Sequence, residues 1–171
     1  MKYIIGFVLS SLVFIFQKAV SPFLFFNAFA PTLSINILSL NKEKALWIAF
    51  ASGLLVDLFT STKMGIWSLN FCICTLILFR FKVHFYKDKF LHVGIFAAIF
   101  SSLSSALHTF ITFLFGSEIP FSLKWVVTDC IIMPTIDGLY TIVWFFLSFW
   151  LYDQAKSKIF LLKSKLKLRK R

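Results

Sequence analysis

Charged residues divide this chain into apolar stretches that are long enough, or nearly long enough, to cross a lipid bilayer. A membrane-spanning helix needs about 20 consecutive apolar residues, with a range of roughly 17–25. Of the 171 residues, 59% are hydrophobic and only 15% are charged, whereas a soluble globular domain has about 25% charged residues. Too little polar surface remains to cover a water-soluble fold. The sequence therefore predicts an all-α integral membrane protein and argues against a soluble enzyme or a disulfide-stapled secreted domain.

Six apolar stretches can be separated, and we expect each to form one helix of a transmembrane bundle. Lys18 separates the first stretch from the second, and Lys63 separates the third from the fourth. The fifth and sixth are long enough to span with tilt. The approximate spans are 3–18, 21–40, 45–62, 64–80, 90–115 and 125–152, which gives a six-helix transmembrane domain over residues 1–155 and a basic tail over residues 156–171.

The N-terminal stretch also has features of a signal peptide. Lys2 precedes the apolar run, and residues 28–30 (Ala-Phe-Ala) resemble a small-x-small cleavage site. Pro31 would be the first residue after that cut, which disfavours cleavage, and Lys18 interrupts the apolar run before it. We therefore expect this part of the chain to be retained as the first two spans.

The basic residues are distributed unevenly over the two sides that six spans would create. Short cytoplasmic loops of membrane proteins carry an excess of Lys and Arg. Fifteen of the 18 basic residues lie at the two ends and in the even-numbered loops, whereas only Lys18, Lys63 and Lys124 lie in the odd-numbered loops. We therefore expect both termini to be cytoplasmic.

The formal net charge of +11 belongs mainly to the C-terminal tail, so it does not indicate nucleic-acid binding. Basic clusters next to a membrane bind anionic lipid, and docking of an acidic cytoplasmic partner is the alternative. The tail residues expected to make either contact are Lys163, Lys165, Lys167, Arg169, Lys170 and Arg171.

Three acidic residues, Asp57, Asp129 and Asp137, lie within the apolar stretches. A charged side chain near the centre of a bilayer costs about 2.5–3.5 kcal/mol on insertion scales, so each acid needs a partner or a task. Counted at about 1.5 Å per residue, Asp57, Asp137 and His108 fall in the outer half of the membrane. We expect these three to form a polar cluster that faces the bundle interior. Asp129 lies nearer the outer headgroups, with Lys124 as its expected partner.

Three interpretations of these polar residues remain open: hydrogen bonds that fix helix register, contact with another protein's helix, and a role in transport or catalysis. No P-loop, HExxH, GxSxG or EF-hand motif is present. Cys72, Cys74 and Cys130 lack the spacing and additional ligands of a zinc site. We therefore expect no catalytic residue, no cofactor and no bound metal.

Residues 53–65 are the most distinctive part of the chain. They read Gly53-Leu-Leu-Val-Asp57, continue through Leu58–Thr62, and end in Lys63-Met-Gly65. Gly53 and Gly65 permit close approach of two backbones, and the intervening Thr and Ser residues can cap and turn the chain. The segment therefore predicts a tight hairpin of two helices.

With six expected spans, cytoplasmic ends and this motif, the chain resembles the family of the rod-shape-determining protein MreD. The resemblance implies a non-enzymatic component of the cell-elongation machinery, located in the bacterial inner (cytoplasmic) membrane. Its partners would be an MreC-like bitopic protein, the actin-like MreB and the glycosyltransferase–transpeptidase pair that builds lateral peptidoglycan. It also implies that Gly53, Asp57 and Gly65 shape a face that meets a partner helix.

The same family is similar in fold to the substrate-binding subunits of energy-coupling-factor vitamin transporters, which supplies an alternative function. Such a subunit needs an outer cavity lined by polar and aromatic groups, and a face of small residues for its partner. The fifth span offers such a face in Ala97, Ala98, Ser101, Ser102, Ser104, Ser105 and Ala106. Packing within the chain explains this face equally well. An integral-membrane enzyme is a third reading, which rests only on isolated acids and one histidine.

Overall fold

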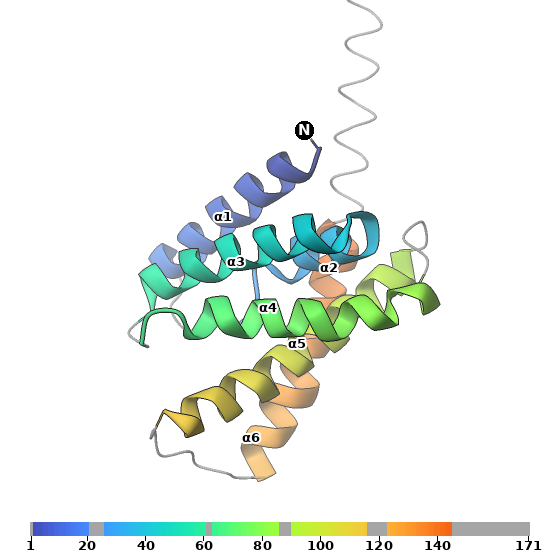
Figure 1. Ribbon diagram of the computed structural model, residues 1–171. Helices are drawn as coiled ribbons and strands as arrows, with labels where there is room; N and C mark the ends of the chain where they lie inside the picture. The colour runs from blue at the N-terminus through green and yellow to red at the C-terminus, as the bar shows by residue number, and fades with distance from the viewer. Residues whose placement is uncertain (1, 21–25, 61–62, 86–89, 116–122, 145–171) are drawn as a thin grey trace, which may run out of the picture.

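The computed structural model describes residues 2–20, 26–60, 63–85, 90–115 and 123–144, which form helices joined by turns without any β-strand (Figure 1). The α-helices are α1 (Lys2–Val20), α2 (Ala30–Ser39), α3 (Lys42–Phe59), α4 (Ile66–Phe81), α5 (Phe90–Leu114) and α6 (Leu123–Val127). A 3-10 turn, η1 (Lys82–His84), follows α4. A π-helical turn, η2 (Thr128–Ile132), joins α6 to an α-helical segment over residues 133–144. Residues 123–144 together are called the C-terminal helix below. The all-α expectation is confirmed for the described residues.

Three segments are long and apolar enough to cross a membrane: Ile66–His84, Leu91–Leu114 and Trp125–Trp144. A shorter apolar segment, Gly6–Ala19, lies within α1. The structure thus confirms helices of membrane-spanning character, but it does not support six of them among the described residues.

The differences from the expected spans lie in α1, whose apolar segment Gly6–Ala19 is shorter than a span, and in α2 and α3. The stretch expected to span over residues 21–40 is helical only from Ala30 in its described part, and the 10 residues of α2 are too few to cross a bilayer. α3 has 18 residues, but Lys42, Glu43 and Lys44 form its first turn, so its apolar part is shorter than a full span. The described part of the last expected span ends at residue 144, and the basic tail lies outside the described residues.

α2 occupies the centre of the bundle. It packs against α1, α3, α4 and α5, and seven of its 10 residues are buried, among them Leu33 and Ile37. Pro31 lies in its first turn, where the missing N–H of proline removes no helical hydrogen bond. The buried residues include the polar Thr32, Ser34 and Asn36, so α2 is covered on its polar and its apolar sides alike. This short helix therefore serves as the core around which the longer helices pack.

Aromatic side chains fill the space around α2. Phe29, Phe71, Phe96 and Phe100 are almost completely buried, and the ring centroids of Phe71 and Phe100 lie 5.9 Å apart. Large apolar side chains also cover the outer surface of the bundle. On α5 these are Leu91, Ile95, Ile99, Phe110, Phe113 and Leu114. Apolar surface on this scale is typical of a protein that faces lipid.

Two glycines lie where α5 crosses the C-terminal helix. A Cβ atom added to Gly138 would lie 2.9 Å from the carbonyl oxygen of Gly94 and 3.2 Å from the Cβ of Ala98. Small residues allow the backbones of two helices to approach this closely. Ala97 is buried as well. Part of the small-residue face of the fifth expected span therefore packs within the chain itself.

Candidate functional site

The α3–α4 hairpin is built around two glycines with different tasks. A Cβ atom on Gly53 would lie 2.3 Å from the Cα and 2.6 Å from the backbone nitrogen of Ser68, so the two helix backbones touch there. Gly65 has a φ angle of 97°, in the left-handed region that glycine adopts without steric cost. It directly precedes α4 and turns the chain into that helix. The motif of residues 53–65 thus forms the tight hairpin that its sequence indicates.

Asp57, which is buried, binds the first turn of α4 from the neighbouring helix. Its Oδ1 accepts a hydrogen bond from the backbone N–H of Trp67 at 3.0 Å. Its Oδ2 accepts from the backbone N–H of Ser68 at 3.2 Å and from the Ser68 hydroxyl at 2.9 Å. The first N–H groups of a helix have no partner within it, and Gly65 at the N-cap position has no side chain to supply one. Asp57 therefore acts as the cap of α4, at the end where the helix dipole favours negative charge.

Trp67 connects this cap to α5. Its ring stacks on the ring of His108, with the centroids 4.1 Å apart and the planes inclined by 20°. The Nε1 of Trp67 and the Nδ1 of His108 are both buried and have no hydrogen-bond partner within the described part of the chain. Asp57 and His108 are thus linked through Trp67, which contacts both.

Asp137, which is 1% exposed, joins the C-terminal helix to two other elements. Its Oδ1 accepts a hydrogen bond from the backbone N–H of Asn27 at 2.9 Å, and its Oδ2 accepts one from the Ser101 hydroxyl. Asn27 lies in the turn before α2, and its side-chain oxygen accepts from the N–H of Phe29 at 3.1 Å. This carboxylate therefore fixes the start of α2 against both α5 and the C-terminal helix.

The π-helical turn η2 (Thr128–Ile132) contains Asp129 and ends two residues before Pro134. Proline has no N–H, so the carbonyl of Cys130 loses the donor that an α-helix would supply. The Ser102 hydroxyl on α5 donates to that carbonyl at 3.2 Å. Asp129 and Asp137 are eight residues apart, and in an uninterrupted α-helix two such residues are rotated by about 80° from each other around the helix axis. The π turn contains one more residue than an α-helical turn, which removes most of this rotation. Asp129 and Asp137 therefore lie on one face of the C-terminal helix.

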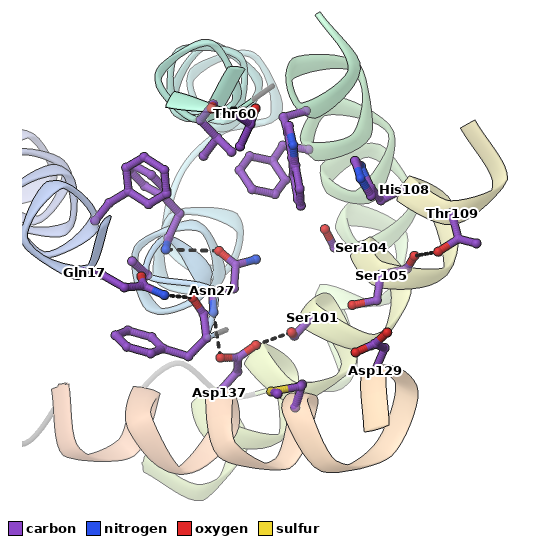
Figure 2. Close-up of a pocket in the computed structure, with 18 of the residues that line it drawn as sticks. Gln17, Asn27, Thr60, Ser101, Ser104, Ser105, His108, Thr109, Asp129 and Asp137 are labelled. Carbon is purple, nitrogen blue, oxygen red and sulfur yellow. Dashed lines mark hydrogen bonds between the residues drawn. The ribbon is translucent and has the colours of Figure 1, made fainter. Parts of the chain in front are cut away.

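The two carboxylates border a cavity of about 350 Å³ (Figure 2). α1 and α3 contribute residues from their C-terminal halves to it, α5 contributes residues from its centre and C-terminal half, and α4 contributes residues from its N-terminal half. The turn before α2 and the first two thirds of the C-terminal helix supply the remaining lining residues. Its aromatic walls are Phe14, Phe26, Phe29, Trp67, Phe71 and Trp125. Its polar lining is Gln17, Lys18, Asn27, Thr60, Ser101, Ser104, Ser105, His108, Thr109, Asp129 and Asp137.

The structure brings together part of the polar cluster expected from the sequence. His108 and Asp137 line the cavity, whereas Asp57 lies behind Trp67 and belongs to the hairpin. Asp129, expected near the outer headgroups, also lines the cavity and is half-buried. Its expected partner, the side chain of Lys124, lies outside the described residues, as do the six basic residues of the tail from Lys163 to Arg171.

Several lining residues were missed by sequence reasoning. Gln17 lies near the C-terminal end of α1 and Asn27 lies in the turn before α2, and no periodic pattern marks either residue. Ser101, Ser104 and Ser105 do follow a pattern, since they share one face of α5 with the predicted His108 at spacings of three, four and seven residues. These serines were interpreted as part of a packing face, although their spacing from His108 also identifies the wall of the cavity.

The described residues contain no group of three His, Cys, Asp or Glu side chains that could hold a metal ion. Cys72, Cys74 and Cys130 are free thiols on α4 and η2. Comparison with known proteins gives no further assignment, because no protein family, no curated protein and no solved structure matches this chain.

Proposed function

We propose that this chain is a non-enzymatic helix-packing scaffold of the bacterial inner membrane and a component of the machinery that builds lateral peptidoglycan during cell elongation. The proposal starts from the resemblance of residues 53–65 to the MreD family. The observation that supports it best is that all three motif residues act in one hairpin. Gly53 allows contact with α4, Asp57 caps α4, and Gly65 turns the chain into it.

The hairpin also presents apolar side chains outward, which a partner helix needs. Leu58, Phe59 and Met64 are 66%, 49% and 72% exposed at the end of the hairpin. Because the capped turn holds α3 and α4 in one relative position, these side chains form a defined surface. We propose that this surface contacts the transmembrane helix of an MreC-like bitopic protein, and that the basic tail contacts anionic lipid.

We further propose six membrane crossings with both ends in the cytoplasm. The cavity lies where the C-terminal halves of α1 and α3 and the second half of α5 meet the start of α4 and the turn before α2, which is the arrangement of an alternating bundle. α2 packs against α1, α3, α4 and α5, so it would lie within the protein rather than against lipid. The charged first turn of α3 and Arg80 at the end of α4 lie at the other end of the bundle, which we assign to the cytoplasm. The cavity then opens toward the outer side.

The experiment is in-membrane cross-linking of a tagged full-length chain, followed by mass spectrometry of the proteins that co-purify. The scaffold proposal predicts recovery of an MreC-like protein and wall-synthesis enzymes. It also predicts that Asp57→Asn, at matched accumulation, reduces this recovery, whereas Asp129→Asn does not. Absence of wall-synthesis proteins from every sample would refute the proposal.

A second candidate is favoured by the cavity itself. A substrate-binding subunit of an energy-coupling-factor type vitamin transporter requires a ligand-sized outer cavity with polar and aromatic walls, and pockets for small molecules have volumes of about 300–1,000 Å³. The cavity of about 350 Å³ is within this range. Recovery of paired ATPases with a coupling protein in the same cross-linking experiment would support this function and contradict the scaffold.

A further inference from the structure

The cavity contains one carboxylate, that of Asp129, for which the described part of the chain supplies no partner. Both oxygens of Asp137 accept hydrogen bonds from the chain, as described above. No hydrogen bond or ion pair joins Asp129 to another described residue, and its carboxylate lines the cavity near the α5 serines (Figure 2). Asp129 is half-buried, and a carboxylate that is partly removed from water is stabilised by pairing with a cation. Asp129 is therefore placed to bind something that enters the cavity.

The side chains around the cavity favour a cation. Of the two carboxylates in its described lining, Asp137 is already hydrogen-bonded to the chain and Asp129 is available to a ligand, whereas the one lysine in this lining is Lys18. Lys18 is exposed, and its Nζ lies 5.7 Å from the centroid of the Phe14 ring. It therefore lies at the rim, above an aromatic face. An anionic ligand inside the cavity would be repelled by the carboxylate of Asp129, whereas a ligand cation would pair with it.

The walls fit the apolar part of such a ligand. Trp67, Phe26 and Trp125 line different sides of the cavity, and aromatic faces attract cations through their ring quadrupoles. The unpartnered Nε1 of Trp67 and Nδ1 of His108 add two polar atoms that a ligand hydroxyl or carbonyl can satisfy. The volume of the cavity lies near the lower end of the range for ligand pockets, so the cavity fits a compact molecule.

We infer that this cavity binds a compact organic cation, in which a primary ammonium pairs with Asp129 and an apolar body lies against the aromatic walls. The site is independent of the scaffold proposal, because its occupancy does not require any protein partner. Two kinds of molecule have such a primary ammonium and could reach the cavity. One is phosphatidylethanolamine of the outer leaflet, through its headgroup, and the other is a free amine from the solution outside.

The test is a titration of the purified full-length chain in detergent, followed by tryptophan fluorescence. The probe is 2-phenylethylamine, and the matched control is 2-phenylethanol, which has the same body with a hydroxyl in place of the ammonium. We expect the amine to bind more tightly than the alcohol by about tenfold or more. Equal binding of the two probes, or no saturable binding of the amine, would overturn the inference. This comparison uses the unaltered chain, so it does not depend on the folding of any variant.

Two variants identify the carboxylate. Asp129→Asn should abolish the preference for the amine while leaving binding of the alcohol unchanged. Glu43→Gln removes the same charge from the exposed first turn of α3, outside the cavity lining, and should retain the preference. A full preference in Asp129→Asn would refute the assignment of this residue.

Reconstitution distinguishes the two sources. In nanodiscs of phosphatidylglycerol alone, 2-phenylethylamine should bind. If addition of phosphatidylethanolamine to the nanodiscs blocks that binding, the occupant is the lipid headgroup. If the amine binds equally in both membranes, the occupant is a free amine. Absence of binding in phosphatidylglycerol nanodiscs would contradict the inference.

Discussion

Asp57 and Trp67 lie ten residues apart on consecutive helices, and a hydrogen bond of 3.0 Å joins the carboxylate of the first to the backbone N–H of the second. The same carboxylate binds Ser68, and the Trp67 ring stacks on His108. A single acidic side chain thus fixes the start of α4 and, through Trp67, one wall of the cavity. Asp57 therefore has a structural role within an apolar stretch. Replacing it should weaken both the start of α4 and the wall of the cavity that Trp67 forms.

Asp57→Ala should lower the free energy of unfolding by about 2–3 kcal/mol, because it leaves two backbone N–H groups and a buried hydroxyl without their charged acceptor. Asp57→Asn keeps one acceptor oxygen and should lose about half as much. Thermal unfolding of the purified chains in detergent measures both. Asp129→Ala should accumulate in membranes better than Asp57→Ala, and equal tolerance of the two changes would contradict the capping role.

Gly53→Ala should destabilise the hairpin by about 1–3 kcal/mol or prevent its accumulation, because the new methyl group would overlap the backbone of Ser68 and Trp67 and push the helices apart. Gly6→Ala is the matched control, since the nearest atom to its added Cβ is a Thr32 methyl carbon at 4.0 Å. Its stability should equal or exceed that of the natural chain. Similar unfolding temperatures for the two variants would show that α3 and α4 do not touch at Gly53.

Gly65→Ala should cost about 1–2 kcal/mol for a different reason, because its added Cβ has no neighbour within 4 Å but the residue must hold a φ angle of 97°. Gly65→Asn should cost less than Gly65→Ala, since asparagine tolerates the left-handed region better than alanine. Chemical unfolding of both variants provides the comparison. If alanine were tolerated as well as asparagine, the conformation assigned to this turn would be wrong.

Asp137→Ala should destabilise the bundle by about 2–3 kcal/mol, because the Asn27 N–H and the Ser101 hydroxyl would lose a buried charged acceptor. Ser101→Ala removes one of these hydrogen bonds and should cost about 1 kcal/mol. Unfolding of each single variant and of the double variant forms a cycle. Strictly additive effects would show that the two side chains do not interact.

The sequence predicted the helical class and the hairpin because both depend on local patterns. Apolar runs of spanning length identify helices, and the spacing of Gly53, Asp57 and Gly65 identifies a tight turn between two of them. The expected location of His108 and Asp137 near one end of the bundle followed from simple counting of the helical rise, and both residues line the cavity.

Other features depend on tertiary packing and could not be predicted in this way. The shortness of α2 is not visible in an uncharged run of 23 residues, Ala19–Asn41, because a buried half-span and a full span have the same composition. The place of Asp129 in the cavity depends on the π turn before Pro134, which changes the helical phase by one residue. Asn27 enters the site only because its backbone N–H meets Asp137 from 110 residues away.

Site-specific photo-cross-linking at the hairpin surface tests the scaffold proposal most directly. A photoreactive residue at position 58, where Leu58 is 66% exposed next to Asp57, should capture an MreC-like protein in living cells. The same residue at position 91, where Leu91 is 69% exposed at the opposite end of the bundle, is the control and should not capture it. Equal capture at both positions, or capture of paired ATPases at position 58, would contradict the account.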